Sequence, residues 1–150
     1  MKTITKRLDI NNIDAILTIS ESDGFPCTLT EKTAKIYCNN NKAPIDGVRS
    51  YGVFENEKLV SIMTATFCYV FPCEDSPCGK IVHISGAYTI PEYRHMHFAS
   101  DLLEMIEADA ILFGADYLCC DSTADGLYLS CGFMPAPKDE TRMWKIVNDK

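Results

Sequence analysis

Hydrophobic and polar positions follow two different periods along the chain, and these periods predict the order of helices and strands. Apolar residues three and four apart predict helices at residues 10–21 and 98–113, and residues 28–39 favour another helix. Runs rich in Val, Ile, Thr and aromatic residues predict strands at residues 3–8, 51–54, 59–71, 80–90 and 117–120. A short helix through residues 128–130 and a closing pair of strands, 133–135 and 143–147, complete the expected order.

Turn signals and connections indicate how these strands pair. The polar run at residues 55–58 separates two strands, which predicts an antiparallel hairpin. A helix joins the strand at 80–90 to the strand at 117–120, which favours a parallel, right-handed βαβ unit. Gly86 inside a strand indicates a bulge or a close backbone approach, and Gly114 suits the end of the long helix. We therefore expect an α/β (α+β) fold with a mixed sheet.

Length and charge restrict the class of protein. The chain has 150 residues, which suits a single domain spanning 1–150. Its formal net charge of -7 argues against nucleic acid, because nucleic-acid binding depends on clustered Lys and Arg. No apolar run resembles a signal peptide or approaches the ~20 residues that cross a bilayer. We expect no membrane contact and a cytoplasmic location.

Eight cysteines raise the question of disulfides or metal binding. In a cytosolic chain they are expected to remain reduced. Cys68, Cys73 and Cys78 recur at five-residue steps and could gather around zinc near His83, although structural zinc sites usually have tighter spacing. The tandem pair 119–120 lies in an apolar run, where we expect the two thiols on opposite faces of a strand with a structural role.

Residues 88–100, with the sequence YTIPEYRHMHFAS, combine the end of a strand, a turn at Pro91 and the start of a helix. The first-turn N–H groups of a helix have no partner within the helix, and the helix dipole adds partial positive charge at this end. A phosphate or pyrophosphate therefore suits this site. Arg94 adds a full positive charge at the same place.

Two motifs in the second half of the chain resemble those of the GNAT superfamily of acetyl-CoA-dependent N-acetyltransferases. PEYRHMHFA is similar to the family's pyrophosphate loop, R or Q-x-x-G-x-G or A, with Arg94 first and Ala99 last. STADGLYLSCGF matches the family's C-terminal pattern A-x-x-L-Y-x-x-x-G-F at Ala124, Leu127, Tyr128, Gly132 and Phe133.

The resemblance implies a mostly antiparallel central sheet with helices on both faces and a cofactor cleft at the parallel βαβ unit. It implies acetyl transfer from acetyl-CoA to a primary amine of a small molecule or peptide, by direct attack in a ternary complex and without a metal. The cofactor-binding residues that it implies are Ala87, Tyr88, Thr89, Ile90, Arg94, His95, Met96, His97, Phe98, Ala99, Ser100 and Ser122. Tyr128 would be the general acid that protonates the departing CoA thiolate.

His97 stands where the family usually has glycine. Its side chain could turn outward from ordinary helical φ/ψ angles and leave phosphate binding intact. Alternatively, the loop is degraded and the protein is a catalytically inactive acyl-CoA-binding or regulatory module. Binding of acetyl-CoA separates these two interpretations.

The general base and the amine acceptor are not identified by the sequence. Base candidates are Glu55, Glu57, Glu74, Asp75, Glu92 and His83. The aromatic residues Phe67, Tyr69, Phe71 and Tyr88 could line an acceptor pocket or belong to the sheet core. We expect acceptor contacts from loops 21–27 and 71–79, and we expect Trp144 in packing or in an interface such as that of a homodimer.

Overall fold

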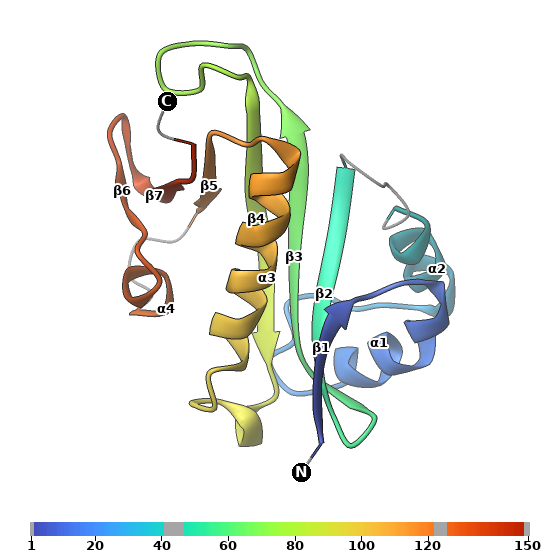
Figure 1. Ribbon diagram of the computed structural model, residues 1–150. Helices are drawn as coiled ribbons and strands as arrows, with labels where there is room; N and C mark the ends of the chain where they lie inside the picture. Colours follow the sequence, from blue (N-terminus) through green and yellow to red (C-terminus); the bar gives the residue numbers. More distant parts are fainter. Residues whose placement is uncertain (1, 41–46, 122–125, 149–150) are drawn as a thin grey trace.

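The computed structural model describes residues 2–40, 47–121 and 126–148, and these residues form a seven-stranded sheet with helices on both faces (Figure 1). The strand order is β1-β2-β3-β4-β5-β7-β6. The strands are β1 (Thr3–Arg7), β2 (Gly47–Glu55), β3 (Lys58–Tyr69), β4 (Lys80–Thr89), β5 (Tyr117–Cys120), β6 (Met134–Ala136) and β7 (Asp139–Ile146). Only the pairing of β4 with β5 is parallel among the described strands. The mixed, mostly antiparallel sheet is thus confirmed.

The helices are α1 (Ile13–Ser20), α2 (Glu31–Asn40), α3 (Phe98–Phe113) and α4 (Gly126–Ser130), with 3-10 turns at Ile10–Asn12 (η1) and Pro91–Tyr93 (η2). The helix expected at residues 10–21 begins as the 3-10 turn because Asp9 caps it, accepting a hydrogen bond from the Asn11 amide. The helix expected from residue 28 begins later, because Thr30 and Thr33 exchange side-chain-to-backbone hydrogen bonds at its start.

Alternate residues of β3 face the two helical layers. Phe67 is fully buried and meets Phe113 of α3, with ring centroids 5.8 Å apart. Ile62 and Thr64, an odd number of residues away, line a cavity together with Ile16 of α1. Since side chains of a strand alternate between its faces, α3 and α1 lie on opposite faces of the sheet.

The ends of several strands differ from the sequence prediction. β2 begins at Gly47 instead of residue 51, and β7 begins at Asp139 instead of residue 143. The cause in β2 is pairing, because residues 47–50 lie opposite Phe67, Thr66, Ala65 and Thr64 of the long strand β3 in the antiparallel register. Residues 48–50, which include Arg49 and Ser50, form a strand because a neighbouring strand supplies hydrogen-bond partners for their backbone groups.

Among the described residues, no helix is long and apolar enough to cross a membrane.

Candidate active site

β4 and β5 part at a bulge in β4. Their parallel pairing runs from Ile81 with Tyr117 to Ile84 with Cys120. On the other side of β4, Ile84 pairs with Ala65 and Gly86 with Thr64, so Ser85 is an extra residue in the ladder. The bulge predicted from Gly86 is therefore present, one residue earlier. Beyond it, β4 continues to Thr89 with no pairing to the described residues of β5.

The open edge of β4 presents amides from alternate residues. The Ile90 N–H donates to the Val60 carbonyl at 2.9 Å and is therefore used within the sheet. Tyr88, two residues before Ile90, lies opposite Ile62, so its amide also points toward β3. In an antiparallel pair, residues whose amides point toward the partner strand alternate with residues whose amides point away from it. The amides of Ala87 and Thr89 consequently point toward the gap between β4 and β5. Of the four residues 87–90 predicted at this edge, these two offer donors.

The segment between β4 and α3 contains two residues in the left-handed region. His95 has φ 67° and His97 has φ 64° with ψ 17°. The expectation that His97 adopts ordinary helical angles is therefore wrong. A left-handed conformation costs a residue with a side chain roughly 1–2 kcal/mol, which explains why glycine suits these positions better. The chain needs this turn to pass from η2 into α3.

A cavity of about 540 Å³ lies at the N-terminus of α3. Its lining includes Thr89, Arg94, His95, His97, Ala99 and Ser100, together with Gly126, Leu127 and Ser130 of α4. His97 is the N-cap of α3 and makes no side-chain capping hydrogen bond. Phe98 lines the cavity but is buried, whereas Met96 is 43% exposed and is not among the described residues that line it.

Arg94 is exposed at this cavity. Its Nε donates to the Thr89 carbonyl at 3.0 Å, and its guanidinium lies 5.8 Å from the centroid of the Tyr88 ring. These contacts hold the charged group beside the mouth of α3. The geometry suits an anion, because it combines a helix N-terminus, a fixed arginine and a cavity.

Tyr128 lies in α4 but is nearly buried. Its side chain is 6% exposed, and its ring meets Phe133 edge-to-face with centroids 5.3 Å apart. Its carbonyl accepts hydrogen bonds from the Cys131 and Phe133 amides, so the residues of the C-terminal motif close this helix. The helix neighbours of Tyr128 line the 540 Å³ cavity, but Tyr128 is not among the described lining residues. Ser122, predicted as a cofactor contact, lies outside the described residues.

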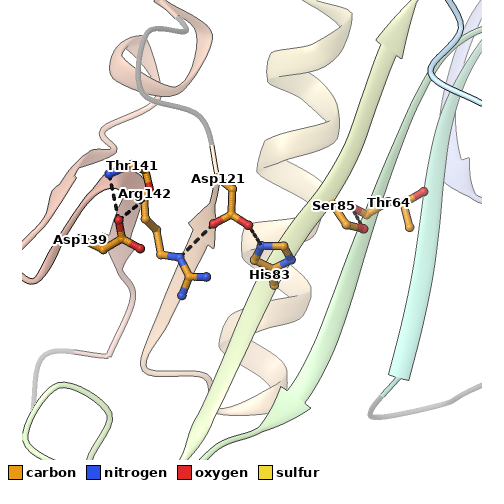
Figure 2. Close-up of polar contacts among 7 residues, drawn as sticks. All are labelled: Thr64, His83, Ser85, Asp121, Asp139, Thr141 and Arg142. Atoms are coloured by element: carbon orange, nitrogen blue, oxygen red, sulfur yellow. Dashed lines mark hydrogen bonds and ion pairs between the residues drawn. The ribbon is translucent and has the colours of Figure 1, made fainter.

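His83, Asp121 and Arg142 form a hydrogen-bonded cluster at the point where β4 and β5 part (Figure 2). The His83 Nε2 atom lies 3.0 Å from one carboxylate oxygen of Asp121, and the Arg142 Nε donates to the other at 3.0 Å. These hydrogen bonds lower the pKa of Asp121 below its ordinary value, and Asp121 raises the pKa of Arg142. Asp121 is therefore a carboxylate that orients an accessible imidazole.

A second cavity, of about 310 Å³, lies on the α1 side of the sheet. Its lining includes residues 85–88 of β4, whereas the next residue, Thr89, lines the 540 Å³ cavity. The two cavities therefore border consecutive residues of the same strand. His83 pairs with Thr66, which is two residues from Thr64 in the wall of this cavity. Directly paired residues share a face, so His83 lies on the same face of the sheet as the 310 Å³ cavity.

The other base candidates lie elsewhere. Asp75 pairs with Lys138 at 3.4 Å, Glu55 is half-buried in β2, and three candidates are exposed: Glu57, Glu74 and Glu92. None of these five is among the described residues that line either cavity. Of the predicted aromatic wall, Tyr88 lines the 310 Å³ cavity and Phe67 belongs to the core, whereas Tyr69 and Phe71 are 60% and 89% exposed.

The cysteines are free thiols in the structure. Within the described residues, no group of three or more His, Cys, Asp or Glu side chains could hold a metal ion, and Cys68, Cys73 and Cys78 form no such group. Cys119 and Cys120 are both buried, and burial raises the pKa of Cys119 to about 12. The burial of both thiols agrees with the structural role expected from the sequence.

The sequence analysis did not predict the hydrogen bond between His83 and Asp121. The sequence offered His83 as one of several base candidates, but Asp121 follows it by 38 residues and carries no motif. The only available signal was the predicted parallel pairing of the two strands, which places residues 83 and 121 near the same edge.

Comparisons with known proteins agree with this geometry. The sequence model of the acetyltransferase (GNAT) family matches residues 14–133. No sequence among the curated proteins matches the chain. The fold is similar to PaiA N-acetyltransferase from Thermoplasma acidophilum in complex with coenzyme A, at 14% identity and TM-score 0.72, over 97% of this chain and 99% of that one.

Two further solved structures share the fold. A predicted acetyltransferase from Clostridium acetobutylicum, solved with acetyl-CoA, has 18% identity and TM-score 0.73 over 91% of this chain and 93% of that one. The aminoglycoside 6'-N-acetyltransferase AAC(6')-Ih from Acinetobacter baumannii has 12% identity and TM-score 0.71 over 89% and 91%. At these identities the likeness concerns the fold.

Proposed function

Because this chain belongs to the acetyltransferase (GNAT) family, whose members are acetyl-CoA-dependent N-acetyltransferases, we propose that it transfers acetyl to a primary amine by direct attack in a ternary complex. One observation carries the proposal. β4 and β5 part after Ile84 and Cys120, and the freed edge of β4 runs between the cavity at α3 and the cavity on the α1 side. Donor and acceptor could thus meet at one strand.

The 540 Å³ cavity would hold the diphosphate of acetyl-CoA. The amides at the start of α3 and the guanidinium of Arg94 supply positive potential there. The left-handed angles at His95 and His97 support this role, because they give the loop the turn that the family's glycines provide. The other cofactor contacts remain predictions at the positions named from the motifs, with Ile90 acting through packing because its amide is bonded to Val60.

The amides of Ala87 and Thr89 would bind the pantetheine arm and the acetyl carbonyl. Negative charge develops on this carbonyl oxygen when an amine attacks, and a positioned donor is then worth roughly 3–4 kcal/mol. Backbone donors of a paired strand are already fixed in place, so little reorganisation accompanies the reaction.

We assign the general base to His83. An amine substrate is mainly an ammonium at neutral pH and must lose a proton before attack. The imidazole lies on the face of the sheet that carries the 310 Å³ cavity, and the Asp121 carboxylate at 3.0 Å would stabilise the imidazolium that forms. The amine nitrogen then forms a bond to the acetyl carbon, and the carbon–sulfur bond breaks to release CoA.

Tyr128 is the proposed general acid for the departing CoA thiolate. Its helix borders the 540 Å³ cavity through Gly126 and Leu127. The phenol is nearly buried, so the proposal requires that the bound thioester approach it from the cavity side.

Calorimetric titration with acetyl-CoA tests the proposal, followed by mass spectrometry of amines incubated with the protein and acetyl-CoA. We expect binding and an acetylated amine. Tyr128→Phe should retain acetyl-CoA binding and lower kcat by roughly 10²–10⁴-fold. Absence of heat at millimolar acetyl-CoA would contradict the proposal, and binding without any turnover would support a catalytically inactive acyl-CoA-binding module.

A further inference from the structure

We propose that the amine acceptor is a small molecule carrying a single amine on an apolar or aromatic group, and that this group occupies the 310 Å³ cavity. The inference rests on the proposed function, because it assumes that the amine approaches residues 85–88 of β4. It goes further by naming the chemical class of the acceptor, which neither the motifs nor the fold specifies.

The wall of the cavity is apolar and without charge. Ile16 of α1, Phe25 and Leu29 from the segment before α2, and Ile62 and Tyr88 of the sheet contribute apolar surface. The polar groups in the lining are those of Thr64, Ser85 and Cys27 and the Tyr88 hydroxyl, all of which are uncharged. None of the described lining residues is Asp, Glu, Lys, Arg or His.

This wall discriminates between amines by the number of their charges. The reacting ammonium can give its proton to His83, but a second ammonium on a polyamine or an amino sugar would enter the cavity without a carboxylate partner. Burial of an unpaired charge is strongly unfavourable, whereas an apolar group gains free energy in proportion to its buried area. An acceptor with one amine and one apolar group satisfies both conditions.

The cavity is held in shape by contacts between its two walls. The Tyr88 hydroxyl donates to the Asp23 carbonyl at 2.6 Å, and the rings of Tyr88 and Phe25 meet edge-to-face with centroids 5.1 Å apart. These contacts fasten the segment between α1 and α2 to β4. A fixed apolar wall favours ligands that match its size.

The size of the cavity limits the acceptor. A volume of about 310 Å³ is at the lower end of the roughly 300–1,000 Å³ of small-molecule pockets, which suits one ring and a short arm. We expect the amine to point along β4 toward Ser85 and the apolar group to lie between Phe25 and Ile62.

A panel of four amines tests the inference at saturating acetyl-CoA: 2-phenylethylamine, 1,4-diaminobutane, glucosamine and a tripeptide with N-terminal phenylalanine. We expect kcat/KM to be at least 100-fold higher for 2-phenylethylamine than for 1,4-diaminobutane. A preference for the diamine, the amino sugar or the tripeptide would overturn the inference while leaving acetyl transfer intact.

A charge introduced at the rim provides a second test. Cys27 is exposed and lines the cavity, so Cys27→Asp places a carboxylate there with little effect on the core. We expect this variant to shift the ratio of kcat/KM values at least tenfold toward 1,4-diaminobutane, and the matched neutral variant Cys27→Ser to leave the ratio unchanged. An unchanged ratio in Cys27→Asp would contradict the proposed position of the apolar group.

Calorimetry with acetyl-CoA separates this inference from the proposed function. If the protein binds acetyl-CoA and acetylates none of the four amines, the acceptor class is wrong. If it does not bind acetyl-CoA, the proposed function itself fails, and the acceptor class fails with it.

Discussion

Asp109 and Asp121 are each held by an arginine and by a ring-bearing side chain, but the two clusters differ in their surroundings. Asp109 of α3 accepts a hydrogen bond from the Tyr51 hydroxyl at 2.6 Å and lies 3.5 Å from Arg49. The Tyr51 side chain is fully buried, and 8% of the Arg49 side chain is exposed. In the second cluster 56% of Asp121 and 28% of His83 are exposed.

The comparison shows that similar polar chemistry serves two purposes according to burial. The Asp109 cluster joins β2 to α3 through a carboxylate that is 29% exposed and two buried groups, Arg49 and the Tyr51 hydroxyl, which lose a shared acceptor when the contact is broken. The Asp121 cluster stands at solvent beside the parting of β4 and β5, where exposed ion pairs add little to stability. Its imidazole is partly exposed, as the proposed role of general base requires.

Replacement of His83 has the largest expected effect. We expect His83→Gln to lower kcat/KM by roughly 10²–10⁴-fold, because a glutamine cannot accept the proton of the amine. The break in the profile that a protonated imidazole causes should also disappear, and the remaining rise of kcat/KM with pH should follow the ionisation of the substrate amine alone. Steady-state kinetics across pH provide the measurement.

His95→Gln is the matched control, since it removes another of the three imidazoles. We expect it to change KM for acetyl-CoA and to keep this break in the profile. A His83→Gln variant with a pH profile like that of the original protein would exclude His83 as the base.

Replacement of Asp109 should produce a large effect on stability, whereas replacement of His83 affects activity. We expect Asp109→Ala to lower the free energy of unfolding by about 3 kcal/mol, because Arg49 and the Tyr51 hydroxyl lose a shared acceptor. Urea denaturation measures this. The exposed Glu104→Ala on the same helix should change stability by less than about 0.5 kcal/mol. Equal losses in the two variants would show that the cluster does not join α3 to the sheet.

Asp121→Asn tests the second cluster with a smaller expected effect. We expect kcat to fall about tenfold, since the amide cannot stabilise an imidazolium as the carboxylate does, while the melting temperature stays nearly unchanged. The lowered pKa of Asp121 also implies that its contribution to stability is present above pH 3.8 and is lost as the pH falls through the lower folded-state pKa. A large loss of stability at neutral pH would make Asp121 a structural residue.

Tyr51→Phe is expected to have the smallest effect, about 1 kcal/mol of stability at neutral pH. Burial and the hydrogen bond to Asp109 raise the pKa of Tyr51 above its ordinary value of 10.0. The phenol therefore contributes stability below pH 10, which is lost as the pH rises toward the folded-state pKa. Denaturation at increasing alkaline pH should show a smaller decline in Tyr51→Phe. Parallel curves for the two proteins would contradict the assignment.

Much of the fold could be predicted because its signals are local. The apolar stripe of α3, the turn at Pro91 and the glycine at 114 each depend on residues within a few positions of one another, and the structure places α3 at Phe98–Phe113 as expected. The C-terminal motif likewise placed Tyr128 in a short helix next to Phe133. The start of β2 could not be predicted, because its polar residues become a strand only by pairing with β3.

The sequence by itself determined the order of elements, the βαβ unit and the two motifs that identify the family. The tertiary structure alone decided that His95 and His97 take left-handed angles, that His83 meets Asp121 and that an uncharged cavity lies along β4. The physical reason is the range of the interactions. Periodicity and capping act over a few residues, whereas strand register brings together side chains 38 positions apart and settles which face of the sheet they share.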